Sequence, residues 1–174
     1  MSSEQNKDVK RRFHIVFLMS RFLDGGIDTV LIEYLKHLAK NEEVKVTLAI
    51  SIAMGTLEVY RHEVPKNVKT VYFSQSRYLT KIPQRRVVKK ASKISKFYDE
   101  LVNNPIRRHR AQKAIRRLAE TADLLIDFDC CAYSFLHNVC AKKIAYFHFS
   151  FAQVMKQNSR RMKRIGRELE NYDT

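Results

Sequence analysis

The pair Gly25-Gly26 stands between an apolar run and a helical pattern, within the stretch FHIVFLMSRFLDGGIDTVLIEYLKHLAK. Glycine allows a backbone to approach a ligand closely and tolerates positive φ. The first N–H groups of the following helix have no partner within that helix and favour a phosphate. The pair therefore predicts a diphosphate-binding site. A tight turn that needs glycine is the alternative, because a lone pair is a weaker signal than GxGxxG.

A histidine, His148, follows the largely apolar run from Ile144 to Phe147. If that run is a strand, the imidazole lies near its carboxyl end, where a ligand could meet it. A histidine at a strand end that is satisfied by the backbone is the alternative.

Two carboxylates flank Phe128 in Asp127-Phe128-Asp129. In a strand they would share one face, and Mg²⁺ takes such oxygen ligands. We favour a structural role instead, in which they cap the loop at the strand end. Cys130, Cys131 and Cys140 lack the CxxC spacing of a zinc site, so we expect small buried residues and no metal.

Most of the charge lies in one segment, from Arg77 to Arg117. It contains fourteen basic residues and two acidic ones, and so holds +12 of the formal net charge of +15. A solvated face is one interpretation. An anionic membrane surface, to which clustered Lys and Arg contribute ~1 kcal/mol each, is another. The residues predicted to form a membrane-binding or acceptor-binding patch are Arg85, Arg86, Lys89, Lys90, Arg107 and Arg108.

Nucleic acid is a third possible partner of this segment. Its aromatic residues are few, namely Tyr78, Phe97 and Tyr98, so bases would find few stacking platforms. The sequence also has no helix-turn-helix, RNP or zinc-finger signature. We therefore expect no nucleic-acid partner.

Alternating strand and helix patterns must position these residues. Strands are predicted at Ile15–Met19, Val44–Ser51, Val68–Phe73, Ala122–Asp129 and in a run ending near His148; helices are predicted at Ile27–Leu38, through Arg77–Arg117, at Tyr133–Cys140 and at Gln153–Tyr172. This order predicts an α/β, Rossmann-like, doubly wound and mainly parallel sheet. The loops Ser20–Gly26, Asp127–Cys131 and His148–Phe151 would then meet at its carboxyl edge, where ligands bind in such sheets.

The length of 174 residues suits one domain, which we place at 13–174 after a disordered polar tail at 1–12. The tail has no apolar stretch of a signal peptide, and no run approaches the ~18 apolar residues of a membrane span. Three cysteines, two of them adjacent, suit a reducing compartment. These features predict a cytoplasmic protein, either soluble or peripheral on the inner face of the cytoplasmic membrane.

Several short motifs, in order, resemble the N-terminal domain of family 4 glycosyltransferases, retaining enzymes of the GT-B fold. They are VFLMSRFLDGGIDTVLIEYLKHL, VKVTLAIS, PKNVKTVYF, ADLLIDFD, KKIAYFHFSF and RELENYD, with Tyr146 where tryptophan is common. The resemblance implies that Gly25 and Gly26 lie against the diphosphate of a nucleotide-sugar donor. It implies that His148 is catalytic, facing the sugar and the acceptor, and that no separate cofactor or metal is needed.

The resemblance also implies a second, donor-binding domain with two glutamates eight residues apart, and no such motif occurs here. We therefore expect a truncated, inactive part of an enzyme, whose missing C-terminal domain could be a separate chain. The whole enzyme would transfer a sugar to a bacterial surface glycan precursor, such as lipopolysaccharide or capsule, carried as a glycan or lipid-linked acceptor. A basic α/β nucleic-acid-binding module and an inactive remnant of a transferase gene are the alternatives.

Overall fold

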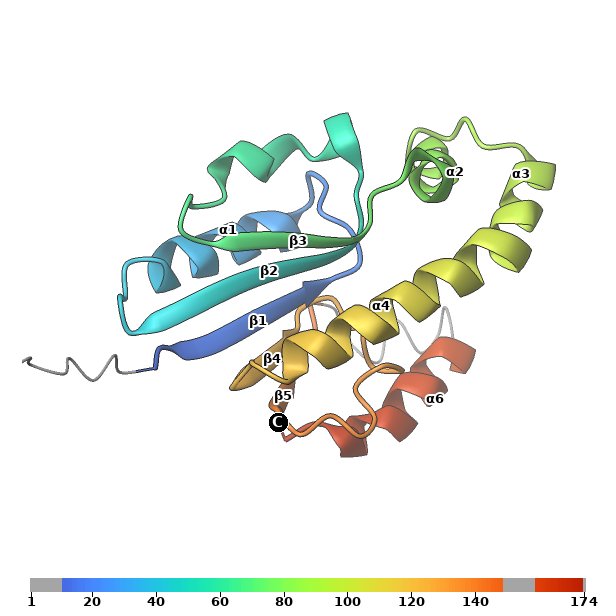
Figure 1. Cartoon of the computed structure of the whole chain (residues 1–174). Coiled ribbons are helices and arrows are strands. Elements are labelled where there is room, and N and C mark those ends of the chain that lie inside the picture. The colour runs from blue at the N-terminus through green and yellow to red at the C-terminus, as the bar shows by residue number, and fades with distance from the viewer. Residues whose placement is uncertain (1–10, 149–158, 174) are drawn as a thin grey trace, which may run out of the picture.

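The computed structural model describes residues 11–148 and 159–173. Its centre is one sheet of five strands, all parallel, in the order β3-β2-β1-β4-β5 (Figure 1). The strands are β1 (Phe13–Met19), β2 (Val44–Ile52), β3 (Lys69–Ser74), β4 (Leu124–Asp127) and β5 (Lys142–Ala145). This arrangement confirms the predicted Rossmann-like, doubly wound sheet.

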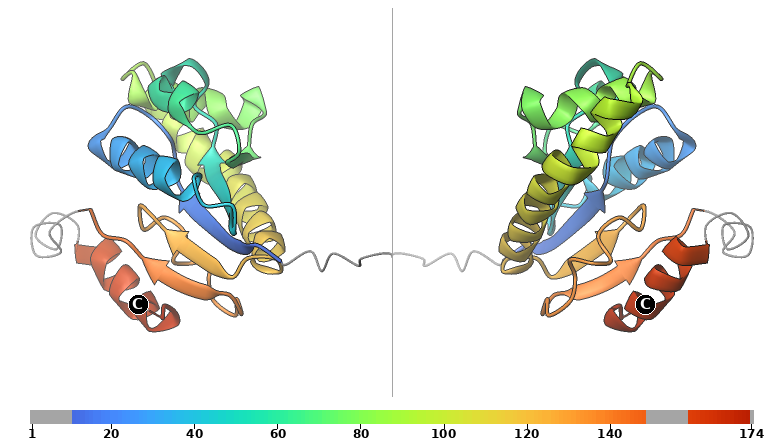
Figure 2. Two further views of the ribbon diagram at one scale, coloured as in Figure 1. Left: turned by 90° about the vertical axis from the view of Figure 1, so that its left-hand side faces the viewer. Right: turned by 90° about the vertical axis from the view of Figure 1, so that its right-hand side faces the viewer.

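The central strand β1 is apolar throughout because both of its faces are covered. Side chains alternate across a strand, and Phe17 lies in a core cluster with Leu31 and Leu35 of helix α1 (Gly26–Leu38). On the other face Val16 and Leu18 pack in a second cluster with helix α4 (Asn104–Ala119). Figure 2 shows α1 and α4 on opposite sides of the sheet.

The connections differ in kind along the chain. Two short 3₁₀ turns, η1 (Gly55–Leu57) and η2 (Val59–Glu63), join β2 to β3. The predicted helical segment is four consecutive elements: α2 (Arg77–Val87), α3 (Lys93–Tyr98), a π-helical turn η3 (Asp99–Asn103) and α4. Near the end of the chain, α6 (Ser159–Glu168) and the 3₁₀ turn η4 (Leu169–Asn171) follow β5.

The helix predicted at Tyr133–Cys140 is wrong. This segment forms separate turns, with hydrogen bonds from the Phe135 N–H to Ala132 O and from the Val139 N–H to Leu136 O. Asn138 has a φ of 59°, which an α-helix does not permit. The apolar side chains Leu136 and Val139 are buried, so the segment packs on the core without helical hydrogen bonding along its length.

Some expectations fall on residues outside the described ranges. They concern residues 1–10 of the polar tail, residues 149–151 of the third loop and the first six residues of the last predicted helix. Within the described ranges, no helix is both long enough and apolar enough to cross a membrane.

Candidate functional site

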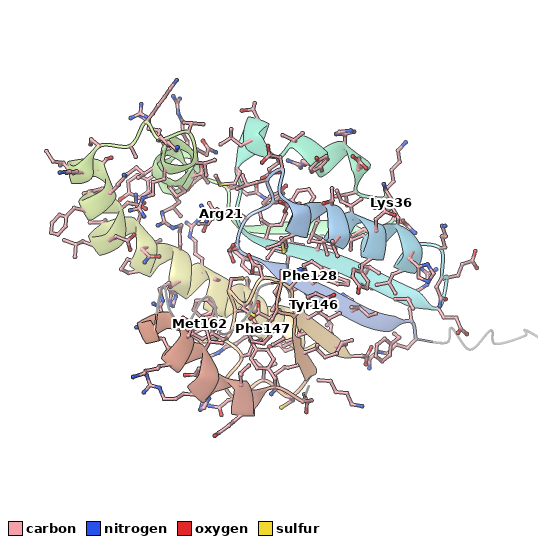
Figure 3. All side chains as sticks on the ribbon, turned by 180° about the vertical axis from the view of Figure 1, so that it is seen from behind. Arg21, Lys36, Phe128, Tyr146, Phe147 and Met162 are labelled. Atoms are coloured by element: carbon pink, nitrogen blue, oxygen red, sulfur yellow. The ribbon has the colours of Figure 1, made fainter. Side chains whose placement is uncertain are left out.

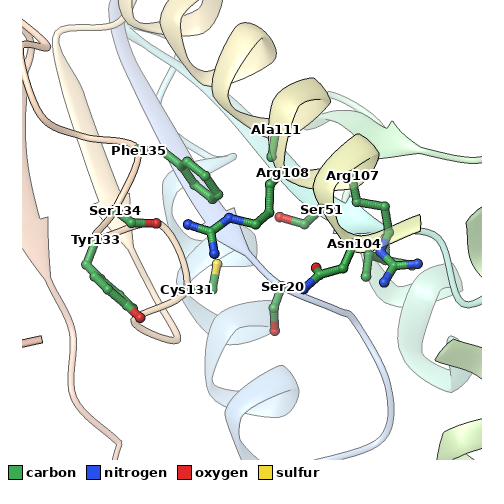
Figure 4. A pocket seen from close by; sticks show the side chains of 11 residues that line it. Ser20, Ser51, Asn104, Arg107, Arg108, Ala111, Cys131, Tyr133, Ser134 and Phe135 are labelled. Atoms are coloured by element: carbon green, nitrogen blue, oxygen red, sulfur yellow. The ribbon is translucent and has the colours of Figure 1, made fainter. Parts of the chain in front are cut away.

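A crevice of about 240 Å³ lies at the carboxyl edge of the sheet. Ser20 after β1, Ser51 in β2 and Cys131 after β4 contribute to its wall, together with residues of α4 (Figure 4). The chain runs from β1 outward through β2 to β3, and then returns to place β4 on the other side of β1. Ligands bind at such a switch in strand order, because the neighbouring loops diverge there and leave a gap.

Two adjacent arginines of α4 line this crevice but differ in what they do. Arg108 is exposed, and its guanidinium lies 5.7 Å from the ring centre of Phe135. Figure 4 shows the guanidinium of Arg108 between Phe135 and Cys131, whereas that of Arg107 points away from them. Among the crevice-lining residues that the structure describes, Arg108 is therefore the cation that an anionic ligand can reach.

Arg107 is buried, and its guanidinium forms hydrogen bonds within the protein. Its Nη1 and Nη2 atoms donate to Asp99 Oδ1 and Oδ2 at 2.7 and 3.0 Å. Nη1 also donates to Leu79 O at 3.0 Å. Pro83, four residues after Leu79, lacks the N–H that this carbonyl would accept in a regular helix. Arg107 thus replaces the hydrogen bond that Pro83 removes from α2.

Asp99, the partner of Arg107, is 1% exposed. Burial alone would raise the pKa of this carboxyl, but hydrogen bonds from Arg107 and Asn103 and the charges of Arg107 and Arg86 lower it overall. Asp99 is therefore ionised at neutral pH. Arg86 lies 3.5 Å from Asp99 and 2.7 Å from Glu100, so it too belongs to this ion-pair cluster.

These contacts divide the predicted basic patch. Arg85, Lys89, Lys90 and Arg108 are exposed, as a surface patch requires. Arg107 is buried and Arg86 is committed to the ion-pair cluster, so neither is a free surface charge. Sequence reasoning grouped all six because charge alone does not tell which arginine of a helix faces inward.

Gly25 and Gly26 begin helix α1, and neither has positive φ. A Cβ atom on Gly25 would lie 3.3 Å from Asp28 Oδ2, so the capping carboxylate makes this position tight. A Cβ atom on Gly26 would meet nothing within 4 Å. The described chain therefore gives no steric reason for glycine at position 26.

The start of α1 carries its own carboxylate. Asp28 Oδ2 accepts a hydrogen bond from the Gly25 N–H at 2.9 Å. Burial raises the pKa of Asp28, hydrogen bonds from the Gly25 and Leu23 backbone lower it, and the charges of Asp129 and Asp24 raise it, for a net increase. Asp28 thus satisfies one helix-end donor and adds negative charge beside the predicted diphosphate site.

Asp127 and Asp129 hold the loop that follows β4. Asp127 is fully buried and accepts hydrogen bonds from the Cys131 N–H, the Ala132 N–H and the Tyr172 hydroxyl at 2.9, 3.0 and 2.7 Å. Asp129 Oδ2 accepts from both the N–H and the hydroxyl of Ser20. This is the loop-capping role that the sequence predicts, and it joins the loops after β1 and β4.

The same two aspartates determine the electrostatics of this loop. Burial raises the pKa of Asp127 to about 6, with a further increase from the charge of Asp129 and decreases from the Tyr172 and backbone hydrogen bonds. Burial also raises the pKa of the Cys131 thiol. Possible ligand atoms of Asp127, Asp129 and Cys131 lie within 4.8 Å of one another, but both carboxylates already hold the loop.

His148 lies three residues beyond β5, in an aromatic cluster. Its ring centre is 4.5 Å from that of Phe128 and 4.6 Å from that of Tyr146, and Tyr34 of α1 packs on Phe128. Figure 3 shows Phe128 and Tyr146 side by side. Burial lowers the pKa of His148, although a hydrogen bond with the Phe128 backbone and the charge of Asp129 act against this. The imidazole is therefore neutral at neutral pH.

The structure thus brings the predicted loops together in pairs. Ser20 binds Asp129, and Phe128 packs against His148. Sequence reasoning missed Ser20, Tyr172 and Asp28, all of which fix this edge of the sheet. For Asp28 a signal existed, because an acidic residue at the third position of a helix often caps its start; for the other two the contacts are too distant in sequence.

Comparisons with known proteins support the same fold. The sequence matches no protein-family model, and no curated protein matches it significantly. A solved structure of the lipopolysaccharide outer core galactosyltransferase WaaB, apo form, is similar over 92% of this chain and 38% of that one, with a TM-score of 0.53 and 13% identity. UGT2 of Phytolacca americana, complexed with UDP-2fluoro-glucose and pterostilbene, is similar over 88% and 35%, with a TM-score of 0.50 and 13% identity.

The chain spans little more than a third of the length of either structure. Both neighbours are glycosyltransferases of the GT-B type, and the similarity confirms the predicted α/β, Rossmann-like fold with a parallel sheet. At 13% identity the similarity establishes the fold alone.

Proposed function

We propose that this chain is the acceptor-side domain of a glycosyltransferase that moves a sugar from a nucleotide-sugar donor to a surface glycan precursor, such as lipopolysaccharide or capsule. The supporting observation is the crevice at the switch in strand order, in a sheet that resembles two glycosyltransferases. We further propose the roles that the family 4 resemblance implies: retention of configuration at the sugar, and a donor-binding domain supplied by another part of the enzyme.

Within this proposal the acceptor binds in the crevice, and the donor binds at Gly25, Gly26 and His148, which do not line the crevice. Arg108 binds a phosphate or other anionic group of the acceptor, since it is the exposed cation of the crevice wall. Gly25 and Gly26 lie against the donor diphosphate, where the open space at Gly26 allows close approach. His148 faces the sugar and the acceptor as a neutral imidazole, able to accept a proton. Such a site acts mainly by positioning its substrates and by stabilising the leaving diphosphate.

The experiment is amide NMR on the ¹⁵N-labelled chain, titrated separately with UDP-galactose and with a sugar 1-phosphate as an acceptor probe. We expect UDP-galactose to shift the amide signals of Gly25 and Gly26, and the sugar phosphate to shift those of Ser134 and Phe135 beside Arg108. Arg108→Gln should abolish the second response and leave the first.

The matched control is Arg110→Gln, which removes an exposed arginine of the same helix that does not line the crevice. It should leave both responses unchanged. Shifts spread over exposed lysines, equal for any polyanion, would count against the proposal and in favour of unspecific anion binding. Shifts confined to RNA titrations would favour the nucleic-acid alternative.

A further inference from the structure

The segment α3–η3 exposes an apolar face to solvent. Ile94, Phe97 and Leu101 are 83, 67 and 61% exposed, and their spacing of three and four residues places them on one side of a helical segment. Asp99 and Asn103 lie on the opposite side and are buried. We call the three exposed residues the apolar face. Exposed side chains this large and this close together usually mark a binding surface.

Lysines border this face. Lys89 and Lys90 lie in the turn before α3, Lys93 and Lys96 lie on α3 itself, and all four are exposed. The two acidic residues of the segment are neutralised, since Asp99 pairs with Arg107 and Glu100 with Arg86. The surface is therefore apolar at its centre and positive at its border.

We propose that the apolar face of α3–η3 docks on an anionic lipid bilayer. Ile94, Phe97 and Leu101 enter the boundary between headgroups and acyl chains, as the apolar side of an interfacial helix does. The bordering lysines contact the anionic headgroups. A second copy of this chain is a poorer occupant, because it brings the same formal net charge of +15 and the same positive border.

The docking segment is tied to its neighbouring helices and is close to the crevice. The Asp99–Arg107 ion pair fixes η3 to α4, and Arg107 also holds Leu79 of α2. Asn104, which lines the crevice, directly follows η3. A lipid-linked acceptor in the bilayer would therefore reach Arg108 along α4. This last step rests on the proposed function, whereas docking itself rests on the surface alone.

The first test is co-sedimentation of the full chain with vesicles of phosphatidylcholine alone, or of phosphatidylcholine mixed with phosphatidylglycerol. We expect binding to the mixed vesicles. The triple variant Ile94→Ser, Phe97→Ser, Leu101→Ser should bind at least about tenfold more weakly, because its apolar insertion is lost. Replacing the four lysines by glutamine should weaken binding by on the order of a hundredfold or more.

The matched control replaces three exposed apolar residues elsewhere, as Phe13→Ser, Val30→Ser, Val59→Ser. It should bind the mixed vesicles as the unmodified chain does. Equal losses in the two triple variants would overturn the proposal, as would equal binding of the α3–η3 triple variant and the unmodified chain.

The second test uses the absence of tryptophan from the sequence. Phe97→Trp places a single tryptophan on the apolar face, and Val59→Trp places one elsewhere on the surface. With mixed vesicles, the emission of Phe97→Trp should shift to the blue and be quenched by brominated acyl chains, while that of Val59→Trp stays unchanged.

Three outcomes would contradict membrane docking. A blue shift of Phe97→Trp that rises with protein concentration without vesicles would assign the face to self-association. A shift with RNA but not with vesicles would assign it to nucleic acid. No shift under any of these conditions would leave the face without the proposed partner.

Vesicle binding without any NMR response to sugar ligands would refute the proposed function and retain docking.

Discussion

At the residue scale, the main question about the site is why position 26 is glycine. Neither backbone conformation nor packing in the described chain demands glycine there. At this position, the start of a helix, alanine costs nothing sterically and reduces the freedom of the unfolded chain. Gly26→Ala is therefore a clean test of the proposed donor site, because any effect on ligand binding would not come from strain in the folded chain.

Gly26→Ala should leave the free energy of unfolding unchanged or raise it by about 0.4–1 kcal/mol. It should weaken the binding of UDP-galactose by at least about tenfold, since a methyl group would occupy the ligand's space. Calorimetric titration and urea unfolding measure the two effects. Gly166→Ala in α6, whose Cβ also meets nothing within 4 Å, is the control and should not alter binding. Unimpaired binding by Gly26→Ala would remove Gly26 from the donor site.

Tyr172 and Asp127 form a second informative pair, because their hydrogen bond depends on pH. The pKa of Asp127 is raised to about 6, so its ionised form destabilises the folded chain, and stability falls as pH rises from about 4 through 6. The Tyr172 hydroxyl opposes this by donating to the carboxylate.

Tyr172→Phe should therefore cost about 1–2 kcal/mol at pH 8, and less near pH 4, where Asp127 is protonated. Urea unfolding across this pH range is the measurement. Tyr78→Phe, which alters an exposed tyrosine, should cost within about 0.5 kcal/mol at every pH. A cost of Tyr172→Phe that does not change with pH would show that Asp127 is not the group that responds.

At the element scale, the basic segment shows that a helix can end without the glycine that usually marks its C-terminus. Helix α2 ends in a Schellman motif, in which the Lys90 N–H donates to Arg85 O and the Lys89 N–H to Arg86 O. Lys89 takes the left-handed conformation, with a φ of 57°, where glycine is the usual residue. Ser92 then caps α3 by accepting from the Ser95 N–H. The sequence therefore predicts one helical stretch, where the structure has four elements.

The Asp99–Arg107 ion pair holds these elements together. Asp99→Asn should cost about 3–5 kcal/mol in the free energy of unfolding, because it leaves the Arg107 charge buried without its partner. Since the pKa of Asp99 is lowered in the folded chain, this contribution is present above its unfolded pKa and is lost as pH falls through the folded pKa.

Urea unfolding at neutral and acidic pH measures this effect. Glu100→Gln is the matched control, since it removes a neighbouring carboxylate that pairs with Arg86 at the surface, and it should cost below about 1 kcal/mol. Equal costs for Asp99→Asn and Glu100→Gln would contradict a structural role for the buried pair.

At the scale of the whole molecule, the net charge of +15 opposes the compact state through repulsion. Salt screens this repulsion, with a Debye length of about 30 Å at 0.01 M and about 8 Å at 0.15 M. The midpoint temperature of thermal unfolding should therefore rise between these salt concentrations. Replacing Lys89, Lys90, Lys93 and Lys96 by glutamine should make this increase smaller. A midpoint temperature that falls as salt is added would contradict the prediction.

The pattern of apolar and polar residues was sufficient to predict the sheet and its carboxyl edge. Continuous apolar runs that alternate with amphipathic helical patterns were sufficient to predict a parallel sheet. A strand that is covered on both faces, such as β1, must be apolar along most of its length. The loop-capping role of Asp127 and Asp129 also followed, since polar residues at a strand end meet unpaired backbone N–H groups.

Which charged side chains are exposed and which are buried could be seen only in the folded chain. Arg107 and Arg108 are neighbours in sequence, yet one binds Asp99 and the carbonyl that Pro83 leaves without its N–H partner, while the other lies over Phe135 in the crevice. A helix turns each successive side chain by about 100°, so adjacent residues face different surroundings. The surroundings of each side chain are formed by elements that are distant in sequence, so local sequence patterns cannot predict them.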